Sequence, residues 1–129
     1  MKIFLFLDNY VGLEILKFLK NNNENIIGIA LHPKKFQNHT EKIKQIAKLS
    51  KNQIFIGSKK PSKKLCKYLN ENNPDLILTI FWRYILKKNI FELAKFGCIN
   101  FHLSYLPYNR GKKPNFWPFI DQTPAGVSL

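Results

Sequence analysis

The chain has 129 residues, 45% of them hydrophobic, with a formal net charge of +13. This length fits one domain, and eleven Phe, five Tyr and two Trp exclude an intrinsically disordered chain. Cys66 and Cys98 are too few for a disulfide framework or a four-thiolate zinc site, so a reducing cytoplasm is expected. The apolar run Ile3–Leu7 is too short for a signal peptide, and no stretch approaches the ~20 apolar residues of a membrane span.

The positive charge comes from nineteen Lys and only two Arg, accompanied by fourteen Asn. Sites for nucleic acids favour Arg, whose planar fork binds phosphates and base edges. The lysines are spread from Lys2 to Lys113. A solvated basic surface is therefore favoured over a site selected for polyanions, which remains the alternative.

Hydrophobic patterning predicts strands and helices that alternate along the chain. The expected strands are Lys2–Leu7, Asn25–Leu31, Gln53–Ile56, Asp75–Ile80, Cys98–Phe101 and the beginning of one at Val127–Leu129. The expected helices are Val11–Lys20, Glu41–Leu49 with Thr40 as N-cap, one from Pro61 or Ser62 to Asn70, one or two within Tyr84–Lys95, and a short one at Pro114–Asp121. This alternation predicts an α/β fold of three layers around a mainly parallel, Rossmann-like sheet.

Ligand sites in such sheets lie at the carboxyl ends of the strands, where the strand order reverses. If the order is 3-2-1-4-5, the ends of the first, fourth and fifth strands are neighbours. Asp8, Phe81 and His102 would then line one crevice.

Several common site motifs are absent from the sequence. The loop after the first strand has no G-x-G-x-x-G, and neither a P-loop nor an H-E-x-x-H occurs. The three histidines do not stand at metal-ligand spacing with either cysteine, so no metal is expected.

Asn100 and His102 stand two residues apart at the end of a predicted strand. Alternation along a strand places both side chains on the same side. An amide donor and an imidazole there can face a developing oxyanion, and the imidazole can also pass protons. A purely structural role is the more common fate of an Asn and a His at a strand end, so that alternative stays open.

The stretch Asn100-x-His102-x-Ser104-x-Leu106-Pro107-x-x-Arg110-Gly111 resembles the signature of the formyltransferase catalytic domain. Gly126-Val127-Ser128 resembles the G-V-T that begins that family's next strand. Members use 10-formyltetrahydrofolate and include glycinamide ribonucleotide, methionyl-tRNA and sugar-nucleotide formyltransferases. The resemblance implies a sheet of the formyltransferase type, with residues 1–129 forming the N-terminal catalytic domain.

The resemblance also implies roles for matched positions. Asn100 would donate a hydrogen bond to the formyl oxygen, and His102 would polarise the same oxygen or relay protons. The folate ring system would be held by the stretch Phe81, Trp82, Arg83, Tyr84, Ile85 and Leu86. Leu106 and Pro107 would form the wall around the formyl group.

One element of the family pattern is not found. The family's catalytic Asp lies in a segment beyond the G-V-T strand, whereas this sequence ends at Leu129 and Asp121 does not match. A domain truncated at its C-terminal side is therefore expected, with little or no transfer activity by these 129 residues alone.

The acceptor is predicted from the residues after Arg110. Pro114-Asn115-Phe116-Trp117 resembles the pattern of enzymes that act on amino sugars linked to nucleotides. The residues assigned to substrate binding are Tyr10, which follows the first strand, and Ser104, Arg110, Gly111, Asn115 and Trp117; Lys112 and Lys113 could meet phosphates.

Several alternatives remain at this point. Arg110 could merely brace its loop, and Trp117 could pack a helix on the sheet. Methionyl-tRNA is the second acceptor, for which a separate tRNA-binding or oligomerisation module would lie downstream. A binding-only remnant that holds folate or nucleotide without catalysis is the alternative from a different class.

Overall fold

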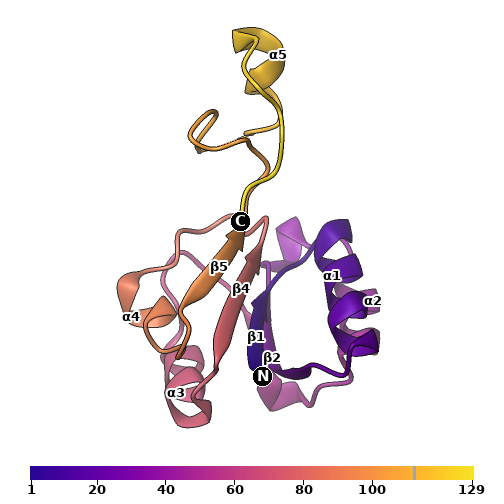
Figure 1. The fold of residues 1–129 in the computed structure, drawn as a ribbon. Helices are drawn as coiled ribbons and strands as arrows, with labels where there is room; N and C mark the ends of the chain where they lie inside the picture. The colour runs from indigo at the N-terminus through magenta and orange to yellow at the C-terminus, as the bar shows by residue number, and fades with distance from the viewer. Residues whose placement is uncertain (112) are drawn as a thin grey trace.

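Five apolar runs form one parallel sheet in the computed structural model, which describes residues 1–111 and 113–129 (Figure 1). The strands are β1 (Lys2–Phe6), β2 (Asn25–Leu31), β3 (Ile54–Ile56), β4 (Leu76–Ile80) and β5 (Cys98–Phe101). Their order is β3-β2-β1-β4-β5, and all four pairings are parallel. The predicted α/β class and strand order are thus confirmed.

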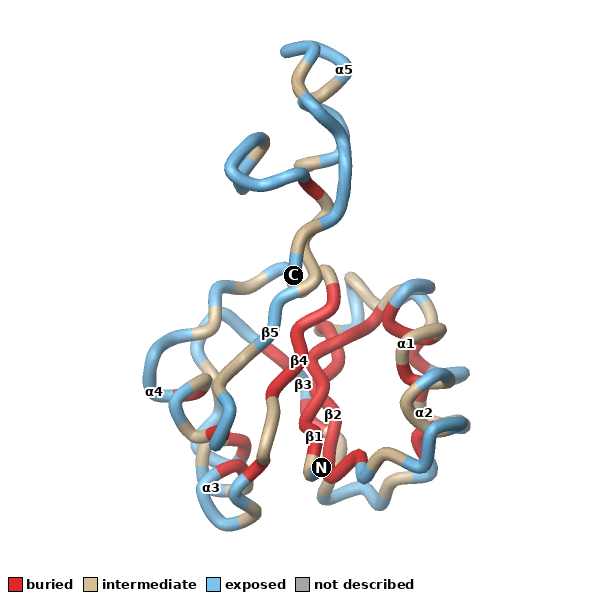
Figure 2. Tube along the Cα trace, in the orientation of Figure 1, coloured by how far each residue is buried: buried red, intermediate tan, exposed pale blue. Residues whose placement is uncertain are grey.

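Helices cover both faces of the sheet and give three layers (Figure 1). On one face, α1 (Tyr10–Asn21) and α2 (Thr40–Ala47) pack against apolar residues of β1 and β2. On the other, α3 (Lys63–Asn72) and α4 (Lys88–Phe91) cover a core that contains Phe4, Phe6 and Phe55. Burial on both faces explains why the central strands read as continuous apolar runs (Figure 2).

Side-chain caps start two of the helices. The Asn9 side chain accepts a hydrogen bond from the Gly12 amide at 2.8 Å, and Ser62 accepts one from the Leu65 amide at 3.1 Å. Such caps satisfy amides that a helix cannot pair internally and stabilise it by about 1 kcal/mol. The expected Thr40 cap is wrong, because Thr40 is the first residue of α2 and its hydroxyl instead donates to Asp8 at 2.6 Å.

One short helix is found within Tyr84–Lys95, as expected: it is the four-residue α4, preceded by a loop that begins at Phe81 with a φ of +49°. The expected strand at Val127–Leu129 is wrong, because the end of the chain contributes an isolated antiparallel bridge between His102 and Ser128 instead. The remaining short elements are the 3-10 helices η1 (Lys34–Phe36) and η2 (Lys51–Gln53), and α5 (Trp117–Asp121).

Residues 104–111 and 113–129, here called the C-terminal arm, leave the sheet beyond β5 and return to it (Figure 1). Two backbone hydrogen bonds of 2.9 and 3.0 Å between His102 and Ser128 close the base of the arm. The Ser128 hydroxyl accepts from the Leu106 amide at 3.0 Å and donates to the Ser104 carbonyl at 2.8 Å. Most of the arm is exposed (Figure 2).

No helix within the described residues is long and apolar enough to cross a membrane.

Candidate functional site

A pocket of about 910 Å³ opens where the chain leaves β4 and β5. Its lining comes from the loop after β4, from the end of β5, from the segment after β3 and from the C-terminal arm. These residues are Lys59, Phe81, Trp82, Arg83, Tyr84, Ile85, Lys87, His102, Leu103, Gly111, Lys113 and Pro114. The volume lies within the range of small-molecule sites.

The sheet register places Asn100 of β5 opposite Thr79 of β4. The Thr79 hydroxyl is buried and donates a hydrogen bond of 2.6 Å to Oδ1 of the exposed Asn100. Because Oδ1 is engaged, the Nδ2 group is the end of the amide that can donate to a ligand. His102 lies two residues further along the chain and lines the pocket itself.

The structure gathers part of the predicted donor-binding set. Phe81, Trp82, Arg83, Tyr84 and Ile85 all line the pocket. Leu86 is partly buried against the core under α3 and α4 instead. Leu106 and Pro107 are exposed in the C-terminal arm, joined by a cis peptide bond, and are not among the described lining residues.

The predicted acceptor-binding residues are more dispersed. Gly111 lines the pocket. Arg110, Asn115 and Trp117 are exposed along the C-terminal arm, with Trp117 beginning α5, and Lys112 lies outside the described residues. Tyr10 is 61% exposed at the start of α1, with its ring 5.9 Å from that of His39.

Ser104 is the buried member of the same predicted set. Its side chain is 1% exposed, and its hydroxyl has no hydrogen-bond partner among the described residues. It lies at the base of the C-terminal arm rather than in the pocket lining.

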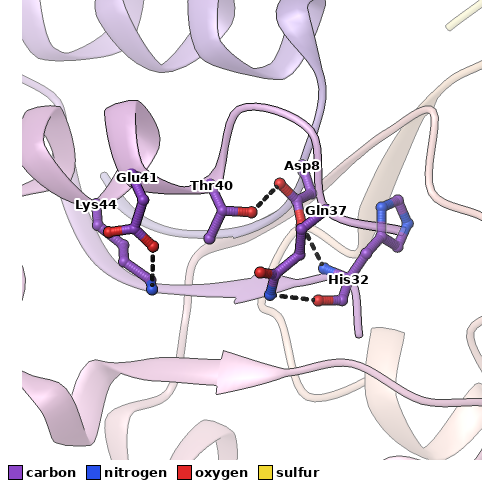
Figure 3. A network of polar contacts seen from close by, with 6 residues as sticks. All are labelled: Asp8, His32, Gln37, Thr40, Glu41 and Lys44. Atoms are coloured by element: carbon purple, nitrogen blue, oxygen red, sulfur yellow. Dashed lines mark hydrogen bonds and ion pairs between the residues drawn. The ribbon is translucent and has the colours of Figure 1, made fainter. Parts of the chain in front are cut away.

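The expectation that Asp8 shares a crevice with Phe81 and His102 is wrong for Asp8. Phe81 and His102 line the pocket, but Asp8 is 1% exposed and is not among the described lining residues. Its carboxylate accepts from the Thr40 hydroxyl and, at 3.0 Å, from the His32 amide (Figure 3). Asp8 therefore joins β1, β2 and α2 inside the fold.

Rings that do not line the pocket themselves pack against residues of its wall. His32 stacks on Trp82, with ring centroids 4.3 Å apart and planes 11° from parallel. Phe6 contacts Trp82 edge-on, and the Arg83 guanidinium lies 3.5 Å above the Phe36 ring centre. Burial lowers the pKa of His32 below its ordinary 6.5, with Asp8 opposing this shift and Arg83 adding to it.

Charge in the pocket has one sign. Among the described lining residues, Lys59, Arg83, Lys87 and Lys113 are cationic and none is acidic. Such a lining attracts anionic ligands. In the part of the chain that the structure describes, no group of three or more His, Cys, Asp or Glu comes together to hold a metal ion.

Sequence reasoning missed several residues of this site. Lys59 and Lys87 come from segments without a motif, and no sequence signal marks them among nineteen lysines. Thr79 stands out only as a polar residue inside the apolar run of β4, and its partner becomes evident once the β4–β5 register is known. His32 follows β2 without a motif around it, yet it is buried against Trp82.

The sequence of the chain is similar to that of known proteins. A family model described as formyl transferase matches residues 3–123. Methionyl-tRNA formyltransferase of Clostridioides difficile is 29% identical over 116 residues, which cover 86% of this chain and 38% of that protein. The chain thus spans less than two-fifths of the length of this curated relative.

Solved structures share the fold. Glycinamide ribonucleotide transformylase 1 from Geobacillus kaustophilus superposes with a TM-score of 0.76 at 15% identity, covering 98% of this chain and 71% of that one. The formyltransferase PseJ from Anoxybacillus kamchatkensis, solved with UDP-4,6-dideoxy-4-formamido-L-AltNAc and tetrahydrofolate, has a TM-score of 0.57 at 29% identity. That match covers 98% of this chain and 50% of PseJ.

Proposed function

Because the chain belongs to the formyl transferase family, we propose that its pocket binds 10-formyltetrahydrofolate as the formyl donor for transfer to an amine. The observation that carries this proposal is the neighbouring position of β4 and β5. It brings the loop that begins at Phe81 beside His102 in one pocket, with Asn100 on the adjoining strand.

The chemistry of the lining supports a folate-type donor. A folate combines a flat ring system with a glutamate tail that carries two carboxylates. The pocket offers aromatic and apolar side chains from Phe81 to Ile85 and cations at Lys59, Lys87 and Lys113. Its volume of about 910 Å³ is adequate for a ligand of this size. Tetrahydrofolate is bound in the structure of PseJ.

Asn100 and His102 are the residues that we propose to act on the formyl group. Attack by an amine moves negative charge onto the formyl oxygen, and fixed donors that face this oxygen lower the barrier. Thr79 holds Oδ1 of Asn100, so Nδ2 is available as such a donor. The imidazole of His102 can polarise the same oxygen or carry a proton.

Two acceptors have specific support. Residues 114–117 have the Pro-Asn-Phe-Trp pattern expected for an amino-sugar nucleotide, and PseJ is solved with a UDP-linked formamido sugar. Methionyl-tRNA is at least as well supported, because several curated relatives of this chain carry the name methionyl-tRNA formyltransferase.

Titration and transfer assays separate these proposals. The 129-residue chain is titrated calorimetrically with 10-formyl-5,8-dideazafolate, a stable folate analogue that carries the formyl group. It is then incubated with 10-formyltetrahydrofolate and either methionyl initiator tRNA or a UDP-linked 4-amino sugar. Absence of analogue binding at millimolar concentration would overturn the donor proposal.

The product identifies the acceptor. A formylated tRNA or a formylated sugar nucleotide selects between the two enzymatic proposals. Binding without transfer to either acceptor supports the third possibility, a non-catalytic folate-binding chain. Asn70→Ala, an exposed substitution in α3, is the matched control for Asn100→Ala.

A further inference from the structure

We propose that His32 is a positioning residue for the pocket, because its side chain fixes the loop after β4 although His32 is not itself among the described lining residues. The choice of a folate analogue as the ligand for testing this role rests on the proposed function. The positioning itself concerns Trp82 and Arg83 and can be measured without any ligand.

One imidazole contacts two consecutive residues of the pocket wall. Its ring stacks on Trp82 with centroids 4.3 Å apart and planes 11° from parallel. Its Nε2 accepts a hydrogen bond of 3.4 Å from the Arg83 amide. The rings of Tyr84 and His32 also form a T-shaped pair, with centroids 6.3 Å apart. The orientation of His32 therefore determines where this part of the wall lies.

The backbone of His32 is held from several sides (Figure 3). Its amide donates to Asp8 Oδ2 at 3.0 Å, and its carbonyl accepts from the Gln37 side chain at 2.8 Å. Asp8 in turn accepts from the Thr40 hydroxyl of α2 at 2.6 Å. Because Asp8 and Thr40 are both buried, the two hydrogen bonds to the Asp8 carboxylate are shielded from competing water. The imidazole thus projects from a rigid base.

Trp82 has little freedom on its remaining sides. Phe6 of β1 contacts the indole edge-on with centroids 5.3 Å apart. Gly57, after β3, lies so close that a Cβ at that position would collide with the indole ring. The indole is therefore clamped between His32, Phe6 and Gly57.

The hydrogen bond from Arg83 requires a neutral imidazole, since Nε2 accepts only when it carries no proton. Burial favours this state by lowering the pKa of His32. The charged groups that act on the imidazole are the Asp8 carboxylate, which opposes the shift, and the Arg83 guanidinium, which adds to it. Acidification would protonate Nε2 of His32 and place its N–H against the N–H of the Arg83 amide. The hydrogen bond that holds this part of the pocket wall would then be lost.

The first test measures the surroundings of Trp82 in the pocket wall directly. Trp82 fluorescence is followed from pH 8 to pH 4.5 in a Trp117→Phe background, where Trp82 is the sole indole. A protonated imidazole quenches a stacked indole, so a sigmoidal loss of fluorescence with a midpoint below 6.5 is expected. His32→Phe, which keeps a ring on Trp82, should abolish the transition. His39→Phe, the control, should retain it.

The second test reads ligand binding. His32→Phe should bind 10-formyl-5,8-dideazafolate about 2- to 12-fold more weakly at pH 7.5, which corresponds to the loss of one hydrogen bond. Relative to His32→Phe, the unsubstituted chain should lose affinity as the pH falls below 6.5, and His32→Gln serves as a second variant.

The outcomes distinguish the two proposals. Identical affinity of His32→Phe and the unsubstituted chain at every pH would overturn the positioning role. A Trp82 transition that persists in His32→Phe would also overturn it. If the analogue binds neither protein while the His32-dependent transition is present, the donor proposal fails and the positioning of the wall stands.

Discussion

The hydrogen bond from Thr79 to Asn100 predicts a specific loss when it is removed. Thr79→Val keeps the shape of a side chain that is 4% exposed but deletes the hydroxyl that holds Oδ1 of Asn100 at 2.6 Å. The Asn100 amide can then turn over, so that its oxygen occupies the position of Nδ2. Because Asn100 is exposed, water can satisfy it after the change, and the free energy of unfolding should alter little.

The expected magnitude has a lower and an upper bound. If the two orientations of the Asn100 amide are equally populated, only half of the molecules present Nδ2 to the formyl group. The affinity gained from the formyl group then falls twofold, or by about 0.4 kcal/mol. Removal of the donor itself in Asn100→Ala should cost the net value of one hydrogen bond, about 0.5–1.5 kcal/mol or roughly 2- to 12-fold. Thr79→Val should therefore weaken the contact between Asn100 and the formyl oxygen at least twofold, and by no more than Asn100→Ala does.

The assay compares two ligands that differ only in the formyl group. The affinity ratio of 10-formyl-5,8-dideazafolate to 5,8-dideazafolate is measured by calorimetry for Thr79→Val, Asn100→Ala, the double variant and the Asn70→Ala control. Both single variants should lower the ratio while leaving the affinity for 5,8-dideazafolate unchanged. If Thr79 acts through Asn100, the double variant should match Asn100→Ala.

Two results would contradict these roles of Thr79 and Asn100. Additive losses in the double variant would show that Thr79 contributes independently of Asn100. An unchanged ratio in Asn100→Ala would remove Asn100 from the formyl contact altogether.

Four further outcomes are expected. Phe4→Ala, at a fully buried ring packed on other aromatic rings, should lower the free energy of unfolding in urea by about 3–5 kcal/mol; a loss below about 1 kcal/mol would contradict the described core. Gly57→Ala should displace the Trp82 ring, shift its fluorescence and cost about 1–3 kcal/mol in the same assay, whereas an unchanged spectrum would contradict the close contact. Because burial lowers the pKa of His32, the unfolded chain binds more protons below pH 6.5; stability of the unsubstituted chain relative to His32→Phe should fall from about pH 6.5 down to the folded pKa and then level off. Burial raises the pKa of Cys98 to about 11, so at pH 8 this thiol should react with iodoacetamide more slowly than free cysteine does, and an equal rate would argue against that burial.

The sheet could be predicted because each central strand is recognisable from its own apolar residues. The runs that became β1, β2 and β4 are buried on both faces, and a continuous apolar run is what such burial requires. Spacing by helices then implied parallel strands, and the predicted order agrees with the structure. The resemblance of residues 100–111 to the formyltransferase signature predicted a site at the end of β5, and His102 there lines the pocket.

Tertiary contacts could not be predicted from local pattern. Thr40 has the residue type of an N-cap, but a hydrogen bond to Asp8, 32 positions away, takes its hydroxyl. Within Tyr84–Lys95 the apolar pattern predicts helix but not its extent: Leu86 packs against the core from a loop, and only Ile90 does so from the short α4. These outcomes depend on which segments fold together, and the local sequence does not contain that information.

The same limit applies to the site. Lys59 and His32 reach the pocket or its supporting wall because β3 and β2 end beside the loop after β4. Arg83 and His32 are separated by 51 positions, and their contact follows from the strand order together with the exact length of each loop. The predicted strand order placed the expected crevice at the edge of the sheet where the pocket lies, but it also included Asp8, which is buried and hydrogen-bonded inside the fold.

A crystal structure of the chain with 10-formyl-5,8-dideazafolate would show directly whether the pocket holds the formyl donor. The flat ring system should lie against the loop that begins at Phe81, with the formyl oxygen within hydrogen-bond distance of Asn100 Nδ2, on the side of His102. A ligand bound elsewhere, or a formyl group directed away from both side chains, would contradict the donor proposal.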